Sequence, residues 1–150
     1  MAFERKSLVH TPPDWVDDGA IYFITICLED RNSRALIDPT NAAVIKKAAS
    51  FYHCESHWWI ELIVLMPDHL HALISFNQKV RPMSECIRAW KAYLKRSAGI
   101  QWQRGYFDHR LRTLDAARER ASYIRNNPVR AGLIEPAEDW KYAWSAADLG

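Results

Sequence analysis

The sequence predicts an α+β fold of the ferredoxin-like split βαβ type: an antiparallel sheet with helices on one face, followed by a C-terminal helix that carries a tyrosine. Strand-like and helix-like segments alternate in the order β-α-β-β-α-β, and a Pro-Asp pair divides one long β-branched segment into two strands. A further helical segment follows the last strand. At 150 residues the chain can bury a substantial core, so we expect residues 1–150 to form a single domain.

The first two elements are a strand and a helix. Residues 20–29, AIYFITICLE, are rich in β-branched and aromatic side chains and predict a central strand. Residues 38–55 carry apolar side chains at helical spacing, with Thr40 or Asn41 as the expected N-cap.

The next segment, residues 58–76, is too long for one ordinary strand. Pro67 and Asp68 in its middle predict a tight turn between two antiparallel strands. Residues 83–99 then predict a helix that begins after Ser84 as N-cap and ends at Gly99. Its buried stripe should consist of Ile87, Trp90 and Leu94.

The last two elements complete the pattern. Residues 101–113 predict a final strand, and residues 115–127 a third helix that Pro128 brings to an end. No apolar run is long enough to span a membrane and the N-terminus lacks the apolar stretch of a secretory signal, so we expect a cytoplasmic protein with no membrane partner. The three cysteines form no CxxC pair, which favours reduced thiols over a disulfide framework or a zinc ribbon.

The net charge of +2 hides an uneven distribution of charge. Between Lys79 and Arg112 there are nine Lys and Arg but only Glu85 and Asp108, so this segment carries +7 and the rest of the chain −5. Clustered cations gain affinity for polyphosphate by releasing condensed counterions. The segment is therefore a candidate surface for nucleic acid, although a merely solvated basic face would have the same composition.

Two histidines stand two residues apart in the segment MPDHLHALI, residues 66–74. Alternate side chains of a strand share a face, so His69 and His71 should point one way with Leu73, while the residues between them enter the core. Two imidazoles side by side can ligate one cation and leave positions for a third ligand, water or substrate. A hydrogen-bonded surface histidine pair is the simpler alternative, and zinc hydrolases use such pairs as well.

A second candidate element is SYIRNNPVRAGLI, residues 122–134. Tyr123 and Asn127 are four residues apart, so a helix would place the phenol and the amide on one face. If that face lies over the histidines, the Asn127 oxygen could complete a metal site beside the Tyr123 oxygen. Tyr123 could equally be an ordinary core residue, and Asn127 a polar residue at a helix end.

His-Leu-His within MPDHLHALI, followed by YIRNNPVRAGL and DWKYAWSA, resembles the single-tyrosine HUH transposases, and among them most closely the REP-associated tyrosine transposases. The resemblance extends over nearly the whole chain. It implies that His69 and His71 bind a Mg²⁺ or Mn²⁺ ion, that Tyr123 is the nucleophile, and that Asn127 is the third metal ligand. Many insertion-sequence relatives have Gln at the last position, so the shorter Asn demands a closer approach or a bridging water.

The resemblance implies an enzyme that cleaves and rejoins single-stranded or hairpin DNA through a 5′-phosphotyrosine, with palindromic repeats as targets. The phosphate backbone would be held by Arg88, Lys91, Lys95, Arg96, Arg104, Arg110 and Arg112, and unpaired bases could stack on Trp90, Tyr93 and Trp102. A catalytically silent hairpin-binding protein and a zinc-dependent hydrolase are the alternatives. We favour a monomer over a homodimer that exchanges its tyrosine helices.

Overall fold

The computed structural model describes residues 13–16 and 20–150. Five strands form one sheet in the order β4-β1-β3-β2-β5, and each pair of neighbouring strands is antiparallel. The strands are β1 (Ile21–Cys27), β2 (Trp58–Leu65), β3 (His69–Phe76), β4 (Phe107–Leu111) and β5 (Ala143–Ser145). The sheet and the chain order β-α-β-β-α-β confirm the predicted fold class. That the whole chain is one domain stays a prediction, because residues 1–12 and 17–19 lie outside the described part.

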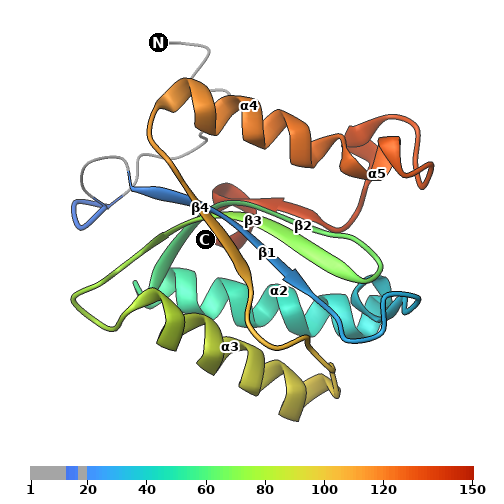
Figure 1. Cartoon of the computed structure of the whole chain (residues 1–150), viewed down its shortest axis with the longest axis horizontal. Helices are drawn as coiled ribbons and strands as arrows, with labels where there is room; N and C mark the ends of the chain where they lie inside the picture. Colours follow the sequence, from blue (N-terminus) through green and yellow to red (C-terminus); the bar gives the residue numbers. More distant parts are fainter. Residues whose placement is uncertain (1–12, 17–19) are drawn as a thin grey trace.

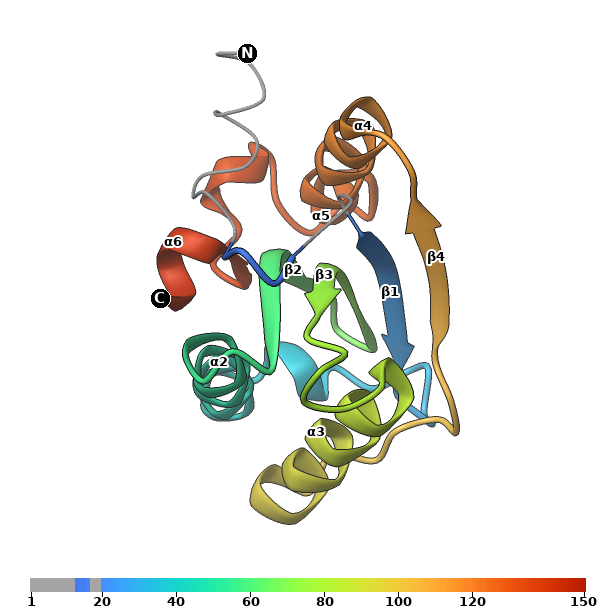
Figure 2. The same ribbon diagram turned by 90° about the vertical axis from the view of Figure 1, so that its left-hand side faces the viewer.

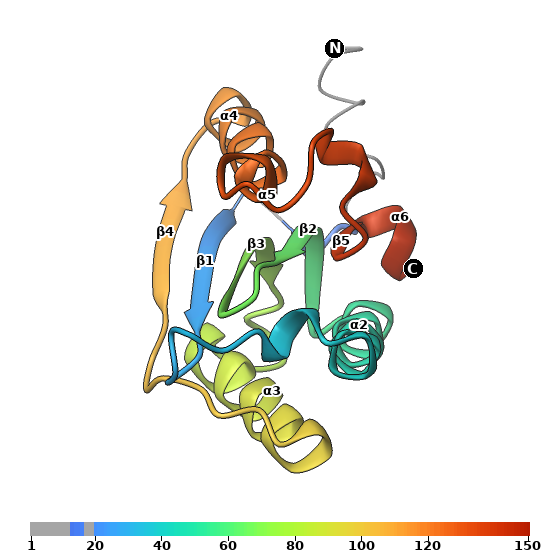
Figure 3. The same ribbon diagram turned by 90° about the vertical axis from the view of Figure 1, so that its right-hand side faces the viewer.

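The helices cover both faces of the sheet (Figure 1). The long ones are α2 (Pro39–Cys54), α3 (Met83–Ala98) and α4 (Leu114–Arg125), and the short ones are η1 (Ala35–Ile37), α5 (Asn127–Arg130), η2 (Ala137–Asp139) and α6 (Ala146–Leu149). Side views show α2 and α3 on one face and α4 with α5 on the other (Figures 2 and 3). In the described ranges, no helix combines the length and the apolar character needed to cross a bilayer.

Two apolar cores follow from this three-layer arrangement. The larger core, under α2 and α3, takes Leu70, Ala72 and Ile74 from β3, whereas Leu73 joins the smaller core under α4. The alternation predicted for β3 is therefore confirmed. The predicted stripe of α3 is also confirmed, since Ile87, Trp90 and Leu94 are all buried in the larger core.

The predicted helix starts were wrong by a few residues. The N-cap of α2 is Asp38, whose carboxylate accepts a hydrogen bond of 3.1 Å from the backbone N–H of Asn41. Pro39 explains this start, because proline is favoured at the first helical position, where no N–H is needed. The N-cap of α3 is Pro82 and not Ser84, and its side chain makes no capping bond. Gly99 ends α3 in the left-handed conformation, as predicted.

The C-terminal elements also differ from the prediction. Only Phe107–Leu111 of the predicted last strand is regular strand, and the chain before it forms a loop that touches the sheet through a bridge between Leu28 and Trp102. Helix α4 starts at Leu114 and ends at Arg125. Pro128 then lies in the first turn of α5, where its missing N–H costs nothing. Strand β5 and the helices around it were not predicted.

Glu61 is a buried carboxyl group at the register shift between Ile60 and Leu62 on β2, with only 3% of its surface exposed. One carboxyl oxygen accepts a hydrogen bond of 2.8 Å from the indole N–H of Trp59, and the other has no hydrogen-bond partner among the described residues. Burial raises the pKa of Glu61 to about 7, although the bond from Trp59 acts in the opposite direction.

We expect this carboxyl group to make the stability of the protein depend on pH. Its pKa is about 4.5 in a solvated chain and about 7 in the fold. Between these two pH values the carboxyl group is protonated in the folded state and ionised in the unfolded state. The free energy of unfolding should therefore decrease as the pH rises, by at most about 3 kcal/mol. Glu61→Gln has no proton to lose, so its free energy of unfolding relative to wild type should increase by up to about 3 kcal/mol between about pH 5 and about pH 8.

Urea unfolding at the two pH values measures this difference. Glu135→Gln removes a solvent-exposed carboxylate and is the matched control. A difference between Glu61→Gln and wild type that stays constant with pH would contradict the prediction.

Candidate catalytic and metal site

The two histidines open strand β3 directly after the Pro67-Asp68 turn. His69 and His71 share the sheet face of Leu73, which is the face covered by α4. Their ring centroids are 4.8 Å apart in an edge-to-face arrangement. The predicted side-by-side projection of the two imidazoles is thus observed.

Each imidazole is oriented by a hydrogen bond at Nδ1. His69 Nδ1 lies 2.8 Å from Oδ1 of Asp68, and His71 Nδ1 lies 2.8 Å from Oγ1 of Thr25 on the neighbouring strand β1. No hydrogen bond between described residues occupies either Nε2 atom. In metal sites the ligating histidine commonly donates its other ring N–H to a carboxylate or a further oxygen in this manner.

Asp68, which bonds to His69, also bonds to residues that follow strand β1. Its second carboxylate oxygen accepts a hydrogen bond of 2.6 Å from Nε of Arg31, and its backbone oxygen accepts one of 2.8 Å from the N–H of Leu28. Burial alone would raise the pKa of Asp68, but the hydrogen bonds from Arg31 and His69 outweigh it and lower the pKa below its usual range. Asp68 is therefore a carboxylate at neutral pH that fixes the ring of His69.

His71 is kept neutral by its surroundings. Burial is the largest cause that lowers the pKa of His71 to about 4, and electrostatic repulsion from the neighbouring His69, Arg120 and Arg130 acts in the same direction. A metal ligand must be the neutral imidazole. The neutral ring of His71, the hydrogen bonds at both Nδ1 atoms and the Nε2 atoms that these bonds leave available fit a divalent cation, so this pair is suited to hold one.

Tyr123 lies on the side of α4 next to its buried stripe of Ala117, Ala121 and Ile124, and 51% of its surface is exposed. The guanidinium carbon of Arg130 lies 3.9 Å from the centre of the Tyr123 ring, and that of Arg120 lies 5.5 Å from it. Arg130 also donates a hydrogen bond of 2.6 Å to the backbone oxygen of Tyr123. Two guanidinium groups therefore lie beside the Tyr123 ring.

A chain of ring contacts connects this phenol to the histidines. The guanidinium of Arg120 lies 4.6 Å from the ring centre of Phe23, and the ring of Phe23 lies 5.3 Å from that of His71. Helix α4 thus brings Tyr123, Arg120 and the histidine pair to one region of the sheet. A tyrosine oxygen, two guanidinium groups and two imidazoles suit the binding and attack of a phosphodiester.

Asn127 is the first residue of α5 and is partly buried. It is four residues after Tyr123, but the helix ends between them, with Asn126 as the C-cap of α4. The Asn126 backbone keeps right-handed helical angles, so the turn continues with little change in direction. None of the hydrogen bonds given by the described residues involves the side chain of Asn127, and its role as third ligand stays a prediction.

The predicted DNA-binding cations lie on α3 and around β4. Those exposed to solvent are Arg88, Lys95, Arg96, Arg104 and Arg112, and Arg110 on β4 is partly exposed. Lys91 is engaged within the protein, because its ammonium donates hydrogen bonds of 2.9 Å and 2.7 Å to the backbone oxygens of Gln103 and Gly105. Burial lowers the pKa of Lys91. These bonds hold the loop before β4, and phosphate binding by these side chains stays a prediction.

Trp90 is fully buried against Trp58 in the larger core, as its place in the predicted buried stripe implies, so it is not available for stacking on bases. Trp102 is partly buried and donates a hydrogen bond to the backbone oxygen of Lys91. Tyr93 is the member of the predicted set that remains exposed.

The sequence analysis missed four residues of this site: Thr25, Asp68, Arg120 and Arg130. Asp68 was assigned only to turn chemistry, although its position beside His69 was a signal for a carboxylate partner. Arg120 precedes Tyr123 by three residues on the same helix, which is a spacing that puts both on one face. Thr25 had no local signal, since its pairing with His71 follows from the register of β1 and β3.

Comparison with known proteins finds relatives of this chain. No protein-family model matches the chain. A protein of Haemophilus influenzae named as a REP-associated tyrosine transposase is 31% identical over an alignment of 144 positions, which covers 83% of this chain and 79% of the relative. The REP-associated tyrosine transposase of Escherichia coli K12 is 24% identical over 133 positions, covering 87% of this chain and 79% of the relative.

A solved structure has the same fold. It is that of a REP-associated tyrosine transposase bound to a REP hairpin; its TM-score to this chain is 0.73 at 23% identity, and the match covers 89% of this chain and 81% of the other. The fold therefore extends over most of both chains. Together with the 31% identity to the Haemophilus influenzae protein, this comparison shows that the chain belongs to the family of REP-associated tyrosine transposases.

Proposed function

We propose that this protein is a metal-dependent endonuclease and strand transferase for single-stranded DNA, acting beside hairpins and forming a 5′-phosphotyrosine at Tyr123. The observation that carries the proposal is the position of α4 over the histidine face of the sheet, with Arg120 and Arg130 in contact with the Tyr123 ring. The hairpin-bound relative supports hairpin DNA as the substrate.

The proposed chemistry is a transesterification. The Tyr123 oxygen attacks a phosphodiester, the O–P bond to tyrosine forms, and the P–O bond to the 3′ oxygen breaks. The phenolic proton is lost and the departing 3′ oxygen gains one, so protons and charge balance. Because the adduct conserves the energy of the bond, a DNA 3′-hydroxyl can reverse the step on another 5′ end without ATP.

His69, His71 and Asn127 would hold the divalent metal ion. When bound, Mg²⁺ or Mn²⁺ would polarise the phosphate and favour departure of the 3′ oxygen. The fixed rings of the two histidines support this assignment, because Asp68 and Thr25 leave each Nε2 available. Arg120 and Arg130 are placed to neutralise phosphate charge that develops beside the Tyr123 oxygen.

The alternatives receive less support. A zinc-dependent hydrolase would need neither Tyr123 nor the two guanidinium groups around it. A silent hairpin-binding protein would not need the hydrogen bonds that orient both histidines. We take the monomer as the working unit, since α4 covers the histidine face of its own chain (Figure 2).

The deciding experiment detects the covalent adduct. The protein is incubated with end-labelled hairpin oligonucleotides from its own genomic neighbourhood, with Mg²⁺, Mn²⁺ or a chelator, and run on a denaturing gel. We expect an adduct that depends on the metal, and proteolysis with mass spectrometry should assign the nucleotide to the peptide containing Tyr123. Binding without adduct in either metal would overturn the proposal and leave the silent hairpin-binding protein.

Arg130 should act as a positioning residue for Tyr123. Arg130→Gln removes the cation stacked on the ring, so we expect the single-turnover rate of adduct formation to fall about 10- to 100-fold. Hairpin affinity should fall much less, because one exposed cation contributes little to a larger phosphate-binding surface. Arg130→Lys keeps the charge but loses the planar stacking, and should give an intermediate rate.

Arg125→Gln is the matched control, because Arg125 is an exposed cation in the last turn of α4, the helix that carries Tyr123. It should leave the single-turnover rate close to that of wild type. Equal loss of affinity and rate in Arg130→Gln would assign Arg130 to DNA binding and contradict the positioning role.

A further inference from the structure

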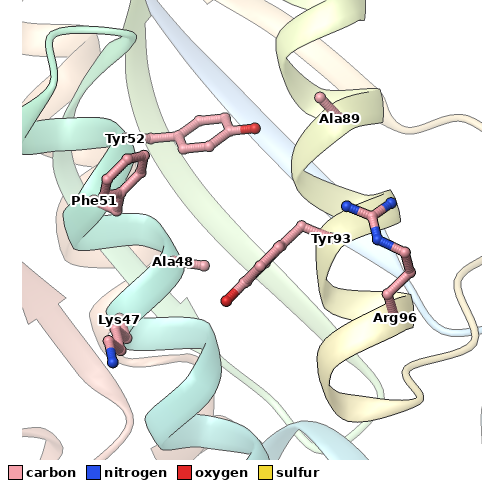
Figure 4. Close-up of a pocket in the computed structure, with 7 residues that line it drawn as sticks. All are labelled: Lys47, Ala48, Phe51, Tyr52, Ala89, Tyr93 and Arg96. Carbon is pink, nitrogen blue, oxygen red and sulfur yellow. The ribbon is translucent and has the colours of Figure 1, made fainter.

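A groove lies between α2 and α3 (Figure 4). These two helices cover the face of the sheet opposite to α4, the helix that carries Tyr123 (Figure 2). The volume of the groove is about 360 Å³, which is within the roughly 300–1,000 Å³ typical of ligand sites. The residues that line it are Lys47, Ala48, Phe51, Tyr52, Ala89, Tyr93 and Arg96. None of them belongs to the histidine and tyrosine site, and only Tyr93 and Arg96 are among the residues that the sequence predicts to contact DNA.

Two aromatic side chains stand exposed in this groove. Phe51 on α2 and Tyr93 on α3 are 60% and 44% exposed, and the ring of Tyr93 extends from α3 towards α2 (Figure 4). Small side chains, Ala48 and Ala89, leave space beside these rings. Exposed rings gathered at one groove indicate a binding surface, because solvent-facing apolar area of this kind has no role in the core.

Tyr52 gives the groove a fixed wall. Its ring stacks on His57 with the centroids 5.0 Å apart, and the guanidinium of Arg81 lies 5.3 Å from its centre. Phe51 lies next to it, with the two ring centroids 6.4 Å apart. A planar ligand that enters between the helices would therefore find aromatic surface already in position.

The charge of the walls identifies the kind of ligand. Helices α2 and α3 together carry six Lys and Arg but only one acidic residue, Glu85, which gives a net charge of +5. Lys47 and Arg96 line the groove from opposite helices. Cations beside exposed aromatic rings are the arrangement that grips single-stranded nucleic acid, in which bases stack and phosphates pair with charge.

We propose that this groove binds unpaired nucleotides of the DNA substrate, with bases stacked on Phe51 and Tyr93 and phosphates beside Lys47 and Arg96. The proposal rests on the proposed function and adds a second contact to it. The sheet separates the groove from Tyr123, so the nucleotides bound here are a different segment of the strand from the one that is cut. The groove would hold a single-stranded flank or loop while the scissile phosphate lies on the other face.

The test compares two labelled DNA probes by fluorescence anisotropy, with chelator present so that no cleavage occurs. One probe is a blunt hairpin, and the other is the same hairpin with a single-stranded flank of about ten nucleotides, the order of a single-stranded site. Phe51→Ala and Tyr93→Ala should each weaken binding of the flanked probe about 5- to 100-fold and leave the blunt probe nearly unchanged. Tyr93→Phe keeps the ring and should keep the affinity.

Further variants test the charges and the position of the DNA. Lys47→Gln should weaken binding of the flanked probe and reduce its salt dependence, whereas Lys46→Gln should not, because the Lys46 ammonium lies over the ring of Trp144. 5-Iodouracil placed in the flank should cross-link to the peptides that contain Phe51 or Tyr93. The exposed positions of both rings make these truncations mild, and circular dichroism with a melting curve checks the fold.

Equal weakening of both probes, or a cross-link map without α2 and α3, would overturn the proposal. So would a change from oligomer to monomer in Phe51→Ala, which would make the groove a protein interface. Failure of the catalytic proposal has a different signature: the wild type forms no adduct, yet binds the flank through Phe51 and Tyr93. An adduct at Tyr123, with flank binding independent of both rings, would refute the groove alone.

Discussion

Tyr123→Phe should abolish the covalent protein–DNA adduct while hairpin affinity stays close to that of wild type. The substitution removes only the oxygen, and the Phe ring can keep its contacts with Arg120 and Arg130. Loss of a nucleophile in an enzyme that works through a covalent intermediate reduces the rate by at least about 10⁴-fold. On a denaturing gel this corresponds to complete disappearance of the adduct band.

Tyr142→Phe is the matched control, because it removes the oxygen of a partly buried tyrosine that packs edge-on against Trp140. Its adduct yield should equal that of wild type. A Tyr123→Phe protein that still forms an adduct would assign the nucleophile to another residue, and mass spectrometry of the adduct would identify it. Reduced hairpin binding in Tyr123→Phe would show that the phenol contributes to binding, which the proposed mechanism does not require.

The parts of the site that depend on local periodicity were predictable from the sequence. Alternation along β3 puts His69 and His71 on one face, and the apolar residues between them hold the strand in the larger core. Tyr123 followed from a motif on a helical segment. Each of these patterns spans only a few consecutive residues, and over such a short stretch the spacing along the chain determines the side-chain direction.

The parts that depend on pairing between distant segments were not predictable. His71 is oriented by Thr25, 46 residues away, and only the register of β1 against β3 brings them together. Helical periodicity shows that α4 has an apolar stripe, but not which face of the sheet it covers. That α4 lies opposite α2 and α3 is decided by Ala117, Ala121 and Ile124, which complete the smaller core with Phe23 and Leu73.

The remaining errors came from competing local signals. Thr40 and Asn41 are good N-cap residues, but Pro39 is favoured in the first turn and the preceding Asp38 provides a carboxylate. Strand β5 has only three residues, too few for an alternating pattern, and it forms by pairing with Leu62, Ile63 and Val64 at the edge of β2. Its existence depends on the sheet already being there.

His71→Ala should reduce adduct formation by about 10³-fold or more, with little effect on hairpin binding measured in chelator. The substitution removes one imidazole and leaves His69 alone, so the affinity for Mn²⁺ should fall along with the rate. Tyr123→Phe differs from His71→Ala in that it should leave the affinity for Mn²⁺ unchanged. Isothermal titration with Mn²⁺ separates the two causes.

His109→Ala is the control for His71→Ala, because His109 is an exposed histidine on β4, opposite Phe23 of β1. It should retain both Mn²⁺ affinity and adduct yield. Thr25→Val tests the orientation of the ring: it keeps the shape of the side chain but removes the hydroxyl bonded to His71 Nδ1, so Mn²⁺ affinity should fall about 10- to 100-fold. If His71→Ala forms the adduct at the wild-type rate, the histidine pair is not the metal site. The cation would then be bound by other residues, and not by Arg120 and Arg130 beside the Tyr123 ring, because cations cannot ligate it.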